Sequence, residues 1–232
     1  MNIAIIPAKK KSTRIKNKNI KLFNGKPIIY WTIKAALDSK VFDKIIVSTD
    51  STKIRKIAKK YGAEAPFLRP KNLTGDLIPI KPVICHAIKY IEKKNIHINN
   101  ICCLFPASPF IKKKNIQNGL KMITKNKKIN FVFVAQEIEK KYSRSFYLQQ
   151  NKLNISNKKF ENFNTQKIPK IFIDAGQFYW ANKKNWFNKT IFSKNSKFIK
   201  IFSKESVDID TNEDWRNAII MEKKLKKNVK FY

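Results

Sequence analysis

The chain has 232 residues, and 43% of them are hydrophobic, so it can bury a large core and is not disordered as a whole. Its formal charge is +34, but the lysines are spread along the whole chain beside many Asn, Ile and Phe residues. This spread is typical of a biased codon composition, so we expect no specific nucleic-acid partner.

Apolar runs alternate with stretches of helical period from one end of the chain to the other. The predicted strands cover residues 3–6, 44–48, 64–68, 100–105, 131–135, 171–180 and 198–201. The predicted helices cover residues 27–38, 51–61, 82–94, 115–124 and 213–227, with Asp50 as the expected cap of the second. This alternation predicts an α/β fold with a doubly wound, mostly parallel sheet.

Residues 136–170 interrupt this alternation, because they are polar and have no clear period. We interpret them as a hairpin-like arm inserted into a single domain that spans residues 1–232.

A basic loop follows the first predicted strand. Residues 9–19 contain Lys9, Ser12, Arg14 and Lys18, directly after the apolar run that ends at Ala8. Ammonium, guanidinium and hydroxyl groups at the carboxyl edge of a parallel sheet can neutralise and orient a polyphosphate. The loop is therefore a candidate phosphate-binding site.

The positions of the glycines and cysteines argue against several other classes of site. The five glycines form neither a dinucleotide-binding GxGxxG motif nor a P-loop. Cys85, Cys102 and Cys103 form no CxxC pair, which argues against a zinc site and for a reduced, cytoplasmic protein. No apolar run is long enough to span a membrane, and the first residues lack the order of a signal peptide.

Acidic residues are scarce, and several of them gather near residue 210. Asp208 and Asp210 are two apart, which places both carboxylates on one face of an extended segment. Oxygen ligands without His or Cys favour magnesium. In the alternative interpretation, the run from Asp210 to Asn212 caps the last helix.

The segment from Asp174 to Trp180 is also unusual, because Asp174, Gly176 and Gln177 open a predicted strand. Asp174 and Gln177 offer hydrogen-bonding groups to a polyhydroxylated substrate, and Gly176 allows close approach to the backbone. The alternative is a turn that leads into an aromatic core strand.

The order Ala8-Lys9, Lys10-Lys11, Ser12-Thr13 and Lys18-Asn19 resembles the N-terminal signature of the sugar cytidylyltransferases that activate nonulosonic acids. Three later segments resemble motifs of the same family in colinear order, namely residues 68–70, 174–180 and 206–211. The second of these is similar to the segment found in pseudaminic acid cytidylyltransferases. The family's loop arginine is Lys9 in this chain, and its usual glycines are Lys10 and Lys11.

This resemblance implies that CTP and an acidic nine-carbon sugar react to give a CMP-sugar and pyrophosphate, with Mg²⁺ as the cofactor. It assigns CTP to Lys9, Ser12, Arg14, Lys18, Asn19 and Arg69, with Lys18, Asp208 and Asp210 as catalytic groups. It assigns the metal to Asp208 and Asp210, and the sugar to Arg144, Asp174 and Gln177. It also implies a homodimer formed through residues 136–170.

Two alternatives remain open from the sequence. The substrate could be a sialic, legionaminic or octulosonic acid instead of pseudaminic acid. In the second alternative, the chain is an inactive basic relative that binds nucleotides or nucleic acid.

Overall fold

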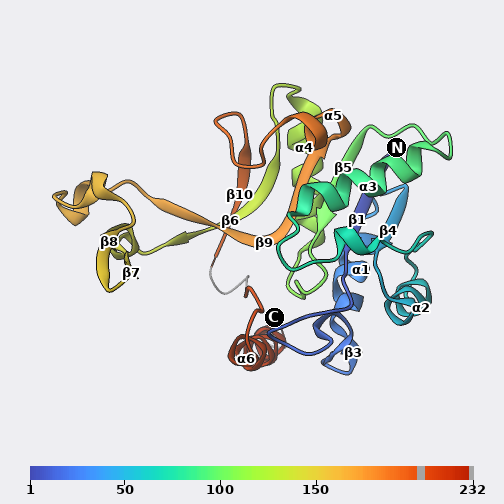
Figure 1. Cartoon of the computed structure of the whole chain (residues 1–232), viewed down its shortest axis with the longest axis horizontal. Coiled ribbons are helices and arrows are strands. Elements are labelled where there is room, and N and C mark those ends of the chain that lie inside the picture. Colours follow the sequence, from blue (N-terminus) through green and yellow to red (C-terminus); the bar gives the residue numbers. More distant parts are fainter. Residues whose placement is uncertain (203–206, 230–232) are drawn as a thin grey trace.

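The computed structural model describes residues 1–202 and 207–229, and a six-stranded sheet forms its centre (Figure 1). Ser206, which opens the predicted acidic motif, lies outside these residues. The strand order is β10–β6–β9–β5–β1–β4. The bounds are β1 (Asn2–Pro7), β4 (Lys44–Ser48), β5 (Asn100–Leu104), β6 (Val132–Ile138), β9 (Ile171–Asn182) and β10 (Lys197–Ile201). Strand β9 runs antiparallel to both of its neighbours, and the other pairs are parallel. The predicted mostly parallel α/β sheet is therefore confirmed.

Helices fill most of the connections between these strands. They are α1 (Ile28–Ser39), α2 (Thr52–Lys60), α3 (Ile80–Glu92), α4 (Lys113–Lys125), α5 (Lys183–Asn188) and α6 (Asn212–Val229). A small hairpin of β2 (Leu22–Phe23) and β3 (Lys26–Pro27) precedes α1. Its two turn residues, Asn24 and Gly25, both have positive φ, as a tight two-residue hairpin turn requires. Among the described residues, no helix has the length and apolar character needed to cross a membrane.

Two local predictions near β4 are wrong. Ser51, not Asp50, caps α2, because its hydroxyl accepts the Ile54 N–H at 3.3 Å. Asp50 instead accepts the backbone N–H of Lys10 at 2.6 Å, and so ties the end of β4 to the basic loop. The predicted strand at residues 64–68 is reduced to two isolated bridges, because Pro66 has no N–H to donate to a ladder.

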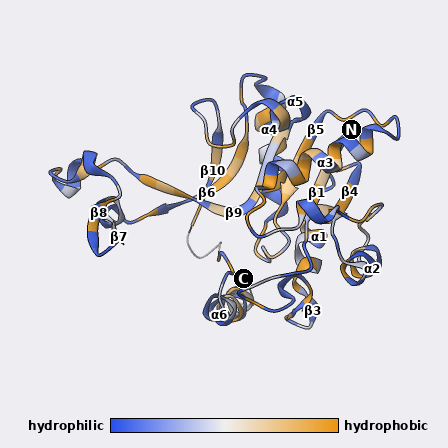
Figure 2. Cartoon of the chain, viewed as in Figure 1, coloured by the Kyte–Doolittle hydropathy of each residue, from blue (hydrophilic) through white to orange (hydrophobic). Residues whose placement is uncertain are grey.

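The sheet is buried on both faces, as the apolar run in β1 predicts. Ile3 and Ile5 pack with α3 and α5 residues on one side, while Ala4 and Ile6 belong to the core beneath α1, α2 and α4. All four of these side chains are fully buried. Figure 2 shows the hydrophobic residues concentrated in this sheet and on the inner sides of its helices. Such a rigid centre gives the loops at the strand ends fixed starting points.

Residues 139–170 project from the sheet as an arm (Figure 1). The last residue of β6, Ile138, pairs with the first residue of β9, Ile171, so the arm leaves and rejoins the sheet at one place. Its outer part is a hairpin of β7 (Phe146–Gln149) and β8 (Lys152–Ile155). This hairpin exposes several large apolar side chains, namely Phe146, Tyr147, Leu148 and Leu153.

Candidate active site

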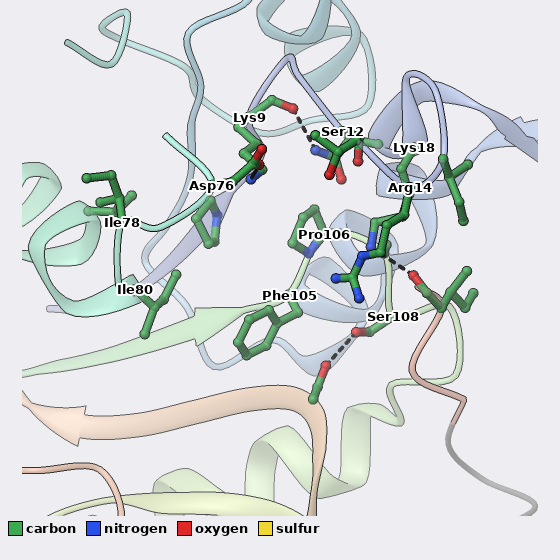
Figure 3. Close-up of a pocket in the computed structure, with 18 of the residues that line it drawn as sticks. Lys9, Ser12, Arg14, Lys18, Asp76, Ile78, Ile80, Phe105, Pro106 and Ser108 are labelled. Carbon is green, nitrogen blue, oxygen red and sulfur yellow. Dashed lines mark hydrogen bonds and ion pairs between the residues drawn. The ribbon is translucent and has the colours of Figure 1, made fainter. Parts of the chain in front are cut away.

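A cavity of about 670 Å³ opens where β1 and β5 end and β9 begins. The long loop after β1 forms one wall, and the segment after β5, including Pro106 and Ser108, forms another (Figure 3). The remaining walls come from Asp174 and Gly176 of β9, from Asp208 and Ile209, and from the segment that leads into α3. Clefts at the carboxyl ends of parallel strands are where α/β proteins bind nucleotides and related ligands.

The basic loop after β1 is anchored at its backbone. The Asn19 amide donates to the Lys9 carbonyl at 2.9 Å, and Asp50 holds the Lys10 N–H from the other side. Lys10 and Lys11 are not among the residues with positive φ, so the loop does not need glycine at these positions. The left-handed residue is Asn17, with φ of 55°, and asparagine tolerates that conformation well. These anchors fix the backbone and leave the cationic side chains to act in the cavity.

Four of the predicted phosphate ligands, Lys9, Ser12, Arg14 and Lys18, line the cavity. Figure 3 shows Lys9 beside Asp76 and, across the cavity, Arg14 beside Lys18. Neutralisation of CTP phosphates by these three cations is thus compatible with where the structure places them.

Asp210 is paired with cations of the basic loop and does not line the cavity. Its carboxylate lies 2.7 Å from the Arg14 guanidinium and 3.3 Å from the Lys18 ammonium. It does not cap α6, because the Thr211 hydroxyl accepts the Asp214 N–H and the Asp214 carboxylate accepts the Thr211 N–H. This reciprocal pair is a capping box, so the run predicted to cap the last helix does so through Thr211 and not through Asp210.

Asp208 and Asp174 place two carboxylates on the cavity wall. Partial burial raises the pKa of Asp208, and the nearby charges of Asp210 and Asp174 raise it further. Burial also raises the pKa of Asp174, although hydrogen bonds from the Tyr179 hydroxyl and the Gly176 N–H oppose this shift. Gly176 has φ of 58°, and its backbone lies against the Asp208 carboxylate. Two anions in one cavity favour a ligand that brings positive charge or hydrogen-bond donors.

The carboxylates of this wall are candidate ligands for a cation. The described residues contain no group of three or more His, Cys, Asp or Glu side chains arranged to hold a metal ion. Magnesium usually takes only one or two carboxylates and completes its shell with water and substrate phosphates. Asp208 fits such a site, because it lines the cavity and both burial and neighbouring negative charge oppose its ionisation. Asp210 fits only if it gives up part of its pairing with Arg14 and Lys18.

Arg69 is 6% exposed and acts as a brace between two segments. Its guanidinium donates to the Ser48 hydroxyl at 3.2 Å, to the Ser48 carbonyl, and to the Leu73 carbonyl at 3.5 Å. Burial lowers the pKa of this guanidinium, with Asp50 partly offsetting the effect. Arg69 lines the cavity as predicted, but these bonds show that it also fixes the segment before α3 to the end of β4.

Two predicted sugar ligands do not reach the cavity within one chain. Arg144 lies on the arm and donates to the Phe163 carbonyl. Gln177 is 3% exposed and does not line the cavity. The prediction for Gln177 treated the whole segment as a polar surface. Gly176 has positive φ and the β6–β9 register shifts beside it, so side chains do not alternate regularly here.

Two residues of the wall were missed in the sequence. Ser108 donates to the Gly176 carbonyl at 2.8 Å and joins the segment after β5 to β9. Its place directly after a buried strand was a usable signal. Asp76 gave no such signal, because it lies in a loop far from any other acidic residue in the sequence.

The comparisons with known proteins agree with this geometry. A family model described as cytidylyltransferase matches residues 3–232. The chain belongs to the cytidylyltransferase family. It is 35% identical over 224 residues to the pseudaminic acid cytidylyltransferase of Campylobacter jejuni, which covers 96% of each protein. It is 32% identical over 219 residues to the CMP-N,N'-diacetyllegionaminic acid synthase of Legionella pneumophila, covering 92% of each.

Among solved structures, the fold of this cytidylyltransferase is similar to that of a CMP:2-keto-3-deoxy-manno-octonic acid synthetase in complex with CTP. The TM-score is 0.74 at 13% identity, covering 96% of this chain and 98% of the other. A 4-diphosphocytidyl-2C-methyl-D-erythritol synthase from Anaerococcus prevotii gives a TM-score of 0.59. At such low identity these likenesses concern the fold, and they confirm the architecture expected from the alternating strands and helices.

Proposed function

We propose that this cytidylyltransferase joins CTP and pseudaminic acid to give the CMP-sugar and pyrophosphate. The observation that carries the proposal is a cavity in which cations of the basic loop face the carboxylates of Asp208 and Asp174. The 35% identity to pseudaminic acid cytidylyltransferases over 96% of the chain supports the choice of sugar.

The reaction forms a bond from the anomeric oxygen of the sugar to the α-phosphorus of CTP. It breaks the bond from that phosphorus to the bridging oxygen of pyrophosphate, and the attacking hydroxyl loses its proton. Both reactants are anions, so catalysis rests on positioning and on charge neutralisation. Lys9, Ser12, Arg14 and Lys18 hold the triphosphate, while Asn19 and Arg69 keep the loops beside the nucleoside in place.

Asp208 would hold magnesium together with phosphate oxygens, and Asp210 would join it once CTP draws Arg14 and Lys18 toward the phosphates. A bound magnesium ion neutralises phosphate charge and lowers the pKa of the attacking hydroxyl. Lys18 is well placed for this exchange, because its ammonium donates to the Ile209 carbonyl at 2.8 Å, between the two aspartates.

Asp174 is the sugar-side group of this proposal. A carboxylate at that point repels the sugar's own carboxylate and accepts hydrogen bonds from hydroxyl or amide N–H groups. The acidic end of the sugar would therefore lie toward the basic loop and its neutral substituents toward β9.

The arm is proposed as the contact of a homodimer in the cytoplasm. Its apolar side chains at Phe146, Leu148 and Leu153 are 60% or more exposed, which favours contact with another protein surface. Arg144 lies on this arm, so it could serve a cavity only in the partner. Sedimentation of the native chain and of a Leu148→Asp variant would test this, and a wild-type monomer would contradict it.

The test of the reaction is pyrophosphate release from CTP with pseudaminic, legionaminic and N-acetylneuraminic acids in parallel, with and without magnesium. We expect release with pseudaminic acid and magnesium, and its loss in Asp208→Asn. Release with another of the acids keeps the reaction and overturns the sugar assignment. Binding of CTP without turnover on any sugar would favour an inactive nucleotide-binding relative.

A further inference from the structure

Asp76 contacts a cation of the proposed phosphate site. Its carboxylate accepts a hydrogen bond from the Lys9 ammonium, which comes from the loop after β1. Figure 3 shows the two side chains together at one side of the cavity. Both residues line that cavity, and their side chains remain partly open to solvent, at 32% for Lys9 and 44% for Asp76. A ligand entering from solvent can therefore reach the pair.

Asp76 also lies in the field of the other cations of this loop. The hydrogen bond and the charge of Lys9 hold the pKa of Asp76 below its usual range, and the charges of Lys11 and Arg14 add to this effect. Lys9 and Arg14 are among the cations that the proposed function assigns to the triphosphate. The Asp76 carboxylate is thus paired with the Lys9 ammonium, a group to which the proposed function assigns a phosphate.

The segment that carries Asp76 lies at the surface, and residues 75–79 are not part of the buried core. It lies between the turn braced by Arg69 and the start of α3 at Ile80. Leu77, its neighbour, is 95% exposed. Gly75 and Ile78 line the cavity, so a shift of this segment changes the cavity wall itself.

We propose that Asp76 takes the place of a CTP phosphate in the free protein, and that the triphosphate of CTP displaces it from Lys9. The proposal rests on the proposed function, because it assigns the phosphates to the loop of Lys9. Two anions cannot share one ammonium group at close range without repulsion. Binding of CTP must therefore release the Asp76 carboxylate and allow its segment to reposition along the cavity wall.

The test is calorimetric binding of Mg-CTP, without sugar, to the full chain and to Asp76→Asn. We expect Asp76→Asn to bind CTP roughly two- to fivefold more tightly at low salt, as removal of a partly exposed ion pair allows. The ratio of the Kd values of the two proteins for CTP should approach one at about 1 M salt, where the screening length is only about 3 Å. Cytidine, which lacks phosphate, should bind both proteins equally.

Asp38→Asn is the matched control. Asp38 pairs with Lys34 at 2.7 Å on the outside of α1, with similar exposure and away from the cavity, so its loss adds the same charge without freeing Lys9. Weaker CTP binding by Asp76→Asn, or a gain no larger than that of Asp38→Asn, overturns the proposal. A wild-type chain that binds no CTP refutes the proposed function instead, and inorganic triphosphate, titrated in the same way, then decides the role of Asp76 separately.

Discussion

Replacing Tyr179 with Phe should weaken the link between the aromatic core and the cavity wall. Tyr179 is 6% exposed, and its hydroxyl donates to the Asp174 carboxylate. The ring should stay in place, because Phe105 packs edge-on against it with 5.3 Å between ring centroids. Asp174 would then keep the backbone N–H groups of Gly176, at 3.3 Å, and of Ala175 as donors.

A hydrogen bond to a charged group contributes about 1.5–3 kcal/mol, so we expect Tyr179→Phe to lower the free energy of unfolding by about that amount. For a chain of this length, this corresponds to roughly 3–12 °C in Tm. Urea unfolding, monitored by tryptophan fluorescence, measures this change in the free energy of unfolding. The pKa of Asp174, already raised by burial, should rise further when the donor is lost. The stability gap between variant and wild type should therefore narrow as the pH falls and Asp174 becomes neutral.

Tyr90→Phe is the matched control for this experiment. The Tyr90 hydroxyl donates to the neutral Pro66 carbonyl at 3.4 Å, so its loss should cost less, about 0.5–1.5 kcal/mol. A double-mutant cycle of Tyr179→Phe with Asp174→Ala should show coupling. Equal losses of unfolding free energy in the two tyrosine variants would refute the reasoning. Additive losses of the two single variants in the cycle would refute it as well. In the sugar assay, Tyr179→Phe should raise the KM for the sugar and leave that for CTP unchanged.

Three further variants test other parts of the structure. Asp208→Asn should abolish turnover and yet raise Tm at neutral pH, because the charged form of Asp208 is disfavoured in the fold. Since its pKa is raised, wild-type stability should gain as the pH falls through that pKa, and this gain should be missing in the variant. Gly119→Ala should lower the free energy of unfolding in urea by a net amount of about 1–2 kcal/mol. The new Cβ would lie 2.5 Å from Trp180, and this clash should outweigh a helix-propensity gain of about 1 kcal/mol. Unchanged stability would show that Trp180 can shift. Arg69→Lys should raise the Kd for CTP and lower Tm, because lysine cannot hydrogen-bond Ser48 and Leu73 together. An unchanged Kd would show that these bonds do not shape the site.

The sheet could be predicted from the sequence because its signals are local. Alternation of apolar runs with helical stretches reflects burial of β1 on both faces, and the same pattern recurs in later strands. The short segment at residues 64–68 was harder, because its apolar composition is typical of a strand, whereas Pro66 removes the hydrogen bonds of a regular ladder. The prediction of Asp50 instead of Ser51 as the helix cap failed because Asp50 accepts a hydrogen bond from Lys10. These two residues are 40 positions apart, so the local sequence does not indicate the contact.

A place on the cavity wall was predictable for residues that follow a strand end, as for Lys9, Arg14 and Lys18. It was not predictable where charge pairing across the fold decides the arrangement. Asp210 faces Arg14, and Asp76 faces Lys9, and neither pairing leaves a trace in the local sequence. Gln177 shows a third kind of error, since it is buried outside the cavity although Asp174, three residues before it, lines the wall.

The closure of the β6–β9 ladder at Ile138 and Ile171 makes the arm an interchangeable module. Because residues 139–170 begin and end at one paired position, replacing them with a short turn leaves the register of the sheet unchanged. The arm also emerges from the β9 end that carries Asp174, so a different arm would present new side chains beside the same chemical machinery. Evolution or design could thus alter the surroundings of the cavity at the β9 end while leaving the loop after β1 intact.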